Sequence, residues 1–207
     1  MLSADNISIC FGDKCVLDHF SCHVKKGDFA CIMGASGCGK TSLLKGFLGL
    51  TPLSSGSIRV GEWMLNEDTC SAIRKHMAYL PQDLALPYGT VDELVRQMFK
   101  VGGVKHTSTA VSQLRENMMK LGLDEDLLSK RMAEISGGQR QRFMLAVLSL
   151  LDKEVWLLDE PTAALDKTSR DYVVDFLMEQ QHKGKTIVAV SHDACFSAKC
   201  SVIIHLS

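Results

Sequence analysis

The stretch that decides the fold is Phe29-Ala30-Cys31-Ile32-Met33-Gly34-Ala35-Ser36-Gly37-Cys38-Gly39-Lys40-Thr41. Its second part, residues 34–41, fits the pattern G-x-x-x-x-G-K-[ST] in full. Glycines let such a loop adopt positive φ angles, so that successive backbone N–H groups can point inward at phosphate oxygens. The apolar run at 29–33 predicts a short buried strand before the loop, and the apolar spacing over 40–50 predicts a helix after it. This stretch therefore predicts a phosphate-binding loop between a strand and a helix.

The residues of the loop have expected roles toward a bound nucleoside triphosphate. Lys40 is expected to reach the β- and γ-phosphates, and the Thr41 hydroxyl to bind Mg²⁺. The helix that begins near Lys40 directs the positive end of its dipole to the same place. Cys38, at the helix start, is either a redox-sensitive thiol or a small residue that fits the loop, and we favour the second interpretation. The candidate nucleotide-binding residues of this stretch are Gly34, Ala35, Ser36, Gly37, Cys38, Gly39, Lys40, Thr41 and Ser42.

A second motif, Val155-Trp156-Leu157-Leu158-Asp159-Glu160, places two acids after four apolar residues. A buried strand that ends in an acid brings a carboxylate to the carboxyl edge of a parallel sheet, where ligands bind. Asp159 is therefore expected to hold Mg²⁺, directly or through water. Glu160 is expected to orient and deprotonate the attacking water near the γ-phosphate. Such a strand is weak evidence alone, but beside a phosphate loop it indicates a nucleotide-hydrolysing site.

The motif that separates this chain from other phosphate-loop proteins is Ile135-Ser136-Gly137-Gly138-Gln139-Arg140-Gln141-Arg142. Here a serine and two glycines open a helix, and their hydroxyl and backbone N–H groups can form an anion site. An ordinary helix N-cap is the simpler interpretation, and both can hold together. The segment closely resembles the signature of the ABC (ATP-binding cassette) family. The resemblance implies that Ser136, Gly137, Gly138 and Gln139 bind the γ-phosphate of ATP held by the opposite subunit.

Other elements of the same family follow in order along nearly the whole chain. Gln82 resembles the glutamine that senses Mg²⁺ and water between the lobes, and residues 163–166 resemble the loop that touches the partner subunit. His192 resembles the switch histidine that contacts the γ-phosphate, and Phe11 takes the place of the aromatic that stacks on adenine. Ile135, where leucine is commoner, and Ala163, where serine is common, depart from the family pattern. The second departure weakens the expected partner contact.

The order of predicted elements indicates an α/β protein with a RecA-like parallel sheet core. Strands are expected at 2–9, 16–24, 29–33, 57–60, 77–80, 155–159, 186–190 and 201–206, and helices at 40–50, 91–99, 108–121, 137–151 and 167–181. The first strands predict a small antiparallel β-subdomain. We expect one ABC ATPase domain, with residues 1–82 and 153–207 as the catalytic core lobe and 83–152 as an inserted helical subdomain that carries the signature.

Composition bounds the classes of partner. The chain has 207 residues and a formal net charge of -1, so no nucleic acid is expected as a partner. No segment reaches the roughly 18–20 apolar residues of a membrane helix, so another chain must supply any membrane part. The 8 cysteines contain no Cys-x-x-Cys pair and are expected to be reduced, mostly buried thiols of a cytosolic protein.

The resemblance implies the ATPase subunit of a membrane transporter, with ATP and Mg²⁺ as cofactors. Two copies would pair head to tail around two ATP molecules and drive a separate transmembrane permease from the cytoplasmic face of the membrane. The apolar residues Leu84, Leu86, Pro87 and Tyr88 are expected either to receive that permease or to cap the local core. A soluble single-cassette ATPase, such as one for iron–sulfur assembly, is the alternative. A nucleotide-binding scaffold without hydrolysis is disfavoured, because Lys40, Asp159, Glu160 and His192 are all present.

Overall fold

The computed structural model describes residues 1–84, 89–105, 107–163 and 165–206. Its centre is a five-stranded sheet in the order β6-β7-β8-β3-β9, and each neighbouring pair is parallel. The strands are β3 (Phe29–Gly34), β6 (Met77–Leu80), β7 (Val155–Asp159), β8 (Thr186–Val190) and β9 (Val202–Leu206). The strands β7 and β8 are buried along their whole length, which explains the apolar runs at 155–158 and 187–190.

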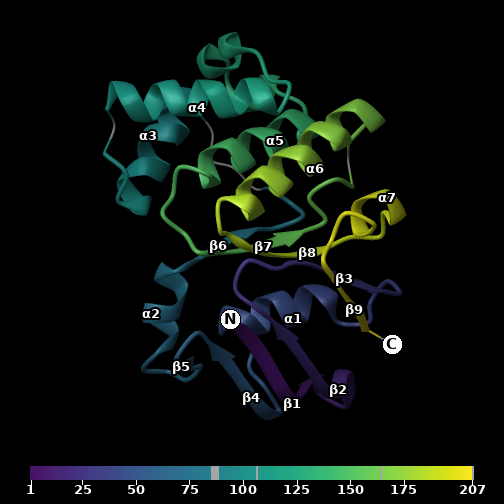
Figure 1. The fold of residues 1–207 in the computed structure, drawn as a ribbon. Helices are drawn as coiled ribbons and strands as arrows, with labels where there is room; N and C mark the ends of the chain where they lie inside the picture. The colour runs from purple at the N-terminus through teal and green to yellow at the C-terminus, as the bar shows by residue number, and fades with distance from the viewer. Residues whose placement is uncertain (85–88, 106, 164, 207) are drawn as a thin grey trace.

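A second, antiparallel sheet has four strands in the order β2-β1-β4-β5. These strands are β1 (Leu2–Phe11), β2 (Lys14–Val24), β4 (Ser55–Val60) and β5 (Trp63–Met64). The helix α1 (Lys40–Phe47) lies between the two sheets in Figure 1, and its buried side chains share one apolar core with both of them. The phosphate loop, which begins α1, is therefore held between two sheets.

The remaining helices lie mainly on the other side of the parallel sheet. Figure 1 shows α3 to α6 above that sheet, while α1, α2 and the antiparallel sheet lie below it. A second apolar core joins α3 to α6 to the upper face of the sheet. The bounds are α2 (Cys70–Lys75), α3 (Val91–Gly102), α4 (Ser108–Lys120), η1 (Glu125–Ser129), η2 (Met132–Glu134), α5 (Gly137–Leu148), α6 (Lys167–His182) and α7 (Ala194–Ser197). Within the described part of the chain, no helix is long and apolar enough to cross a membrane.

The α/β class and the order of elements predicted from the sequence are confirmed. The strand at 77–80 and those at 155–159 and 186–190 have the predicted bounds. The helix after the phosphate loop was predicted too long, because it ends at Phe47. The short elements β5, α2 and α7 were not predicted. Each of them buries at most one side chain, so it leaves almost no apolar pattern.

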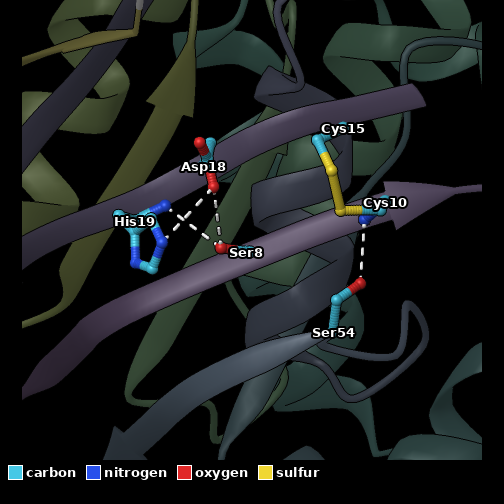
Figure 2. The surroundings of a disulfide bond; sticks show 6 residues. All are labelled: Ser8, Cys10, Cys15, Asp18, His19 and Ser54. Carbon is cyan, nitrogen blue, oxygen red and sulfur yellow. Dashed lines mark hydrogen bonds and ion pairs between the residues drawn. A yellow bond between two sulfur atoms is a disulfide. The ribbon is translucent and has the colours of Figure 1, made fainter. Parts of the chain in front are cut away.

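The expectation of reduced, mostly buried cysteines is wrong. Cys10 and Cys15 form a disulfide between β1 and β2, as Figure 2 shows. Of the free thiols only Cys31 is fully buried, and Cys195 is exposed. The disulfide forms because a tight turn places the two cysteines directly opposite each other, so that their Cα atoms lie 3.8 Å apart.

The central strand β7 offers a test of this packing. Leu157 is fully buried between the α1 layer and its neighbours, so Leu157→Ala is expected to lower the free energy of unfolding by about 2–5 kcal/mol in urea titrations. Ile203→Ala is the matched control, because Ile203 lies on the edge strand β9 with 39% of its surface exposed. The control should cost less than about 1 kcal/mol. Equal losses in the two variants would contradict the placement of β7 at the centre of the core.

Candidate nucleotide-binding and hydrolysis site

Most residues of the phosphate loop, the acidic pair, Gln82 and His192 meet in one cleft at the carboxyl edge of the parallel sheet. The cleft has a volume of about 650 Å³, a size suited to a small-molecule ligand. Its lining comprises Val16, Ser36, Gly37, Gly39, Lys40, Thr41, Ser42, Gln82, Asp159, Glu160, Thr162, Ala163, Arg170, Val190, Ser191, His192 and Asp193. Most of these residues come from the phosphate loop, the acidic pair and the loop of His192. These three segments are far apart in the sequence but line the same cleft.

The phosphate loop has the backbone shape that its glycines allow. Gly37 and Gly39 have φ angles of 81° and 96°, which side chains disfavour. A Cβ atom on Gly39 would also lie 2.9 Å from the backbone oxygen of Val16. Gly39 is the N-cap of α1, and no side chain caps the helix there. The first N–H groups of α1 are therefore open to an anion.

Lys40 and Thr41 lie at the base of the cleft. The buried Lys40 ammonium donates hydrogen bonds to the backbone oxygens of Gly34, at 3.0 Å, and Ala35, at 2.8 Å. The Thr41 hydroxyl donates to Asp159 Oδ2 at 2.8 Å, which joins the loop to the end of β7. Asp159 Oδ1 is buried without a hydrogen-bond partner. A hydroxyl beside a carboxylate oxygen that needs a partner is a donor set that suits Mg²⁺.

Glu160 follows Asp159 in a strained conformation. Its φ is 51°, which is uncommon for a residue with a side chain. Its backbone N–H donates to the Val190 oxygen at 3.1 Å, and its own backbone oxygen accepts from Gln141 Nε2 at 2.8 Å. Its carboxylate lies 3.4 Å from His192 Nε2. These contacts fix Glu160 beside His192 with the carboxylate facing the cleft.

Burial raises the pKa of Glu160 above its ordinary value. The nearby charge of Asp159 raises this pKa further, while His192 and Lys40 lower it. Burial, together with the Asp159 charge, also raises the pKa of Tyr79 to about 12, so this phenol is neutral at pH 7. A carboxylate whose pKa is raised toward neutrality is a better proton acceptor, as a general base requires.

The loop that carries His192 is held from both sides. The Asp193 carboxylate caps α7 by accepting from the N–H of Cys195 at 2.8 Å. It also lies 2.8 Å from Arg170 Nε, on α6. The Ser191 N–H donates to the Ile32 oxygen of β3 at 3.3 Å. His192 therefore projects from a loop tied to α6, α7 and β3.

The signature residues and Phe11 lie away from the described cleft lining, and so do Gly34, Ala35 and Cys38 of the phosphate loop. Ser136 caps α5 through a capping box, in which its hydroxyl accepts from the Gln139 N–H at 3.2 Å. Ser136 and Gly137 are exposed and, within the described lining, the cleft contains none of residues 136–139. Phe11 is 56% exposed at the end of β1 and is also absent from the described lining. Gln82 is exposed and does line the cleft.

Sequence reasoning missed several residues of the site. Thr162, Arg170 and Asp193 line the cleft, and Gln141 reaches Glu160 from α5. Arg170 lies on a helix whose sequence carries no motif, so only its packing reveals it. Gln141 lies inside the signature motif, but the resemblance assigned no role to its position. The predicted Leu86, Pro87, Tyr88 and Ala164 lie outside the described residues.

The fold and this site define a nucleotide-binding protein of the phosphate-loop class. Residues 17–163 match a family model described as ABC transporter. The chain is 32% identical over 215 residues to the achromobactin transport ATP-binding protein CbrD of Dickeya dadantii (strain 3937), covering 99% of this chain and 78% of the relative. It is 32% identical over 196 residues to the ergothioneine transport ATP-binding protein EgtV of Helicobacter pylori (strain G27), covering 93% and 90%. The chain belongs to the ABC transporter family.

Solved structures agree with this assignment. One neighbour is the dimeric structure of a post-hydrolysis state of an ATP-binding cassette bound to ADP and Pi. It matches with a TM-score of 0.87 and 25% identity, covering 100% of this chain and 94% of the neighbour. The resemblance to ABC cassettes and the fold class inferred from the sequence are both confirmed.

The raised pKa of Glu160 can be measured directly. Because His192 lowers this pKa, His192→Ala is expected to move it higher still, toward neutrality. Carbon NMR of the glutamate carboxyls across a pH series would show both values, and the spectrum of Glu160→Gln would identify the signal. A Glu160 signal that titrates at the ordinary glutamate pKa in both proteins would contradict the described burial.

Proposed function

We propose that this chain is the ATP-binding and ATP-hydrolysing subunit of an ABC transporter, and that it drives a separate transmembrane permease. The observation that carries the proposal is the cleft itself. Lys40, Thr41, Asp159, Glu160 and His192 meet there, at the edge of one sheet, in a chain that belongs to this family. The proposed location is cytoplasmic, peripheral on the inner face of the membrane. The relatives reported above bear transport names, which favours this function over iron–sulfur assembly.

The phosphate loop is proposed to hold ATP by its phosphates. Backbone N–H groups of residues 34–42 would surround the phosphate oxygens, with Lys40 turning from its loop carbonyls toward the β- and γ-phosphates. Thr41, Asp159 and Gln82 would hold Mg²⁺, which neutralises charge that develops on the phosphates. Asp159 Oδ1, which is buried without a hydrogen-bond partner, supports this assignment, because the Mg²⁺ site would give this oxygen a partner.

Glu160 is proposed as the general base for the attacking water. Its strained backbone is pinned on one side by Val190 and on the other by Gln141, so the carboxylate stands at a fixed place in the cleft. His192, 3.4 Å away, would contact the γ-phosphate and stabilise the ionised carboxylate. Arg170 would act through Asp193 as a positioning residue for the histidine loop.

A head-to-tail homodimer is proposed as the active form. Of the signature residues at the start of α5, Ser136 and Gly137 are exposed and Gly138 and Gln139 are half-buried, and all four lie outside the described cleft lining of their own chain. A second copy would bring its own signature to this cleft and close it over ATP. Within the proposed dimer, residues 163–166 would contact the partner, and Phe11 would stack on the adenine.

We propose the helical part at 83–152 as the region that meets the permease. Of the apolar residues expected there, Leu84 packs against the upper core in this structure, which accounts for its apolar character without a partner. The predicted Leu86, Pro87 and Tyr88 lie outside the described residues, so the docking role proposed for them stays a prediction. Co-purification with a membrane protein would support the transporter, whereas recovery with a soluble scaffold would support the iron–sulfur alternative.

Replacement of the proposed base is expected to separate binding from hydrolysis. Glu160→Gln keeps the shape and hydrogen bonds of the site but cannot accept a proton, so turnover should fall by about 100-fold or more. ATP should still bind and should trap a dimer detectable by gel filtration. Glu154→Gln, the same change just before the other end of β7, should keep normal turnover. A normal ATPase rate in Glu160→Gln would rule out this residue as the base.

Removal of the loop lysine is expected to weaken nucleotide binding. Lys40→Ala loses charged hydrogen bonds of about 1.5–3 kcal/mol, so ATP affinity should fall by about 10- to 100-fold in calorimetric titrations. Lys45→Ala is the matched control, because Lys45 is exposed on the same helix. If both variants bound ATP like the parent chain, the loop would not be the phosphate site.

A further inference from the structure

The disulfide lies at the tip of the β1–β2 hairpin. Ile9 pairs with Leu17, Cys10 with Cys15 and Phe11 with Lys14, so Gly12 and Asp13 form a two-residue turn. Gly12 has the positive φ of 60° that such a turn needs. Figure 2 shows the sulfur bridge crossing between the two strands, while the Cys10 N–H donates to Ser54 Oγ at 3.1 Å. The bridge thus stands one residue pair behind Phe11.

The base of this hairpin is anchored, and its tip is exposed. Ile9 and Leu17 are buried, and the Leu17 side chain lies against Gly39 of the phosphate loop. Beyond them, Phe11 is 56% exposed, Lys14 and Cys15 are exposed, and Cys10 is half-buried. The disulfide closes a short ring at the exposed end, so it constrains the residues between the two cysteines rather than the core.

The hairpin also touches the nucleotide cleft. Val16 follows Cys15 directly and lines the cleft, and its backbone oxygen faces Gly39 across a gap that a Cβ atom would fill. The hairpin tip therefore begins directly at the edge of the nucleotide cleft. The exposed Phe11 ring, which the fold leaves without a core to pack on, stands on that tip.

We propose that Cys10 and Cys15 are a redox-reversible pair, and that their disulfide raises affinity for nucleotides by fixing the hairpin tip that carries Phe11. The inference rests on the proposed function, in which Phe11 stacks on the base. It fits the proposed cytoplasmic location, because disulfides in that compartment are usually transient and redox-sensing. The exposure of Cys15 gives a thiolate or a reagent direct access to one sulfur of the pair.

The redox step is an ordinary thiol–disulfide exchange with a low-molecular-weight disulfide such as oxidised glutathione. One protein thiolate attacks the reagent, releases one thiol and forms a mixed disulfide. The second cysteine then attacks the protein-side sulfur, closes the Cys10–Cys15 bond and releases the second thiol. Two electrons pass from the protein to the reagent, and the two protein protons end on the two released thiols. A dithiol reductant reverses both steps.

The disulfide is expected to strengthen nucleotide binding because it orders the hairpin tip before the ligand binds, so less conformational entropy is lost on binding. In the reduced chain, Phe11 and the turn must lose freedom when the base stacks, and the oxidised chain has already lost part of it. We expect the oxidised protein to bind ATP about three- to tenfold more tightly than the reduced protein. A ligand that has phosphates but no base should show no such difference.

The test compares two ligands in two redox states. The full chain is poised in oxidised or reduced glutathione, the state of the pair is verified by mass spectrometry of the linked peptide, and binding is measured by calorimetry. The probes are Mg-ATP and Mg-tripolyphosphate. The proposal expects tighter ATP binding on oxidation, with unchanged tripolyphosphate binding. Equal or weaker ATP binding in the oxidised protein would overturn it.

Variants separate this pair from the other thiols and from the proposed function. Cys10→Ser and Cys15→Ser should each bind ATP like the reduced protein in both buffers, whereas Cys195→Ser, which removes an exposed thiol elsewhere, should keep the full response. A response that persists in Cys10→Ser would overturn the proposal. An effect of Cys38 would change binding of both ligands, because Cys38 belongs to the phosphate loop. If neither ligand bound in either state, the proposed function itself would fail.

Discussion

The site depends on three parallel strands that end level with one another. In the sheet, Asp159 of β7 stands beside Val190 of β8, and Val190 stands beside Ile32 of β3. The phosphate loop, Glu160 and the loop of His192 begin one or two residues after Ile32, Asp159 and Val190. All three therefore lie at the same edge of the sheet. Because β7 and β8 are buried on both faces, a one-residue slip in register would exchange the side chains that pack into the two separate cores, and it is disfavoured for that reason. Packing of the strands therefore fixes the spacing of the chemical groups.

Polar groups at that edge are held by partners from different elements. Thr41 ties α1 to β7 through Asp159, while Arg170 ties α6 to the histidine loop through Asp193. Buried polar groups are costly unless they are paired, so each of these contacts limits where its neighbours can stand. The exceptions are informative. Asp159 Oδ1 lacks a partner and Glu160 has a raised pKa, and both residues line the cleft where ligand chemistry would occur.

The sequence predicts those parts of the fold that leave a recognisable residue pattern within one short segment. The run at 155–158 is apolar because its strand is buried on both faces, and the loop at 34–41 is recognised because its glycines allow the backbone to take positive φ angles. By contrast, β5 exposes both of its residues, and Arg170 gains its meaning only when α6 packs beside the histidine loop. The Cys10–Cys15 bridge was missed because the second strand was expected to begin at residue 16. Beginning it at Lys14 leaves a two-residue turn and sets the cysteines opposite each other.

The helix α5 joins the two halves of the proposed mechanism. Its first turn is capped by Ser136, and Ser136 and Gly137 are exposed there, outside the described lining of the cleft of their own chain. A little more than one turn later, Gln141 of the same helix donates to the backbone oxygen of Glu160. An α-helix is stiff over so short a distance. The proposed anion site at 136–139 and the hydrogen bond of Gln141 to Glu160 are therefore held in a fixed relative position. In the proposed dimer, a ligand bound by the signature of one chain would thereby be linked, through a single helix, to the proposed base in that chain's own cleft.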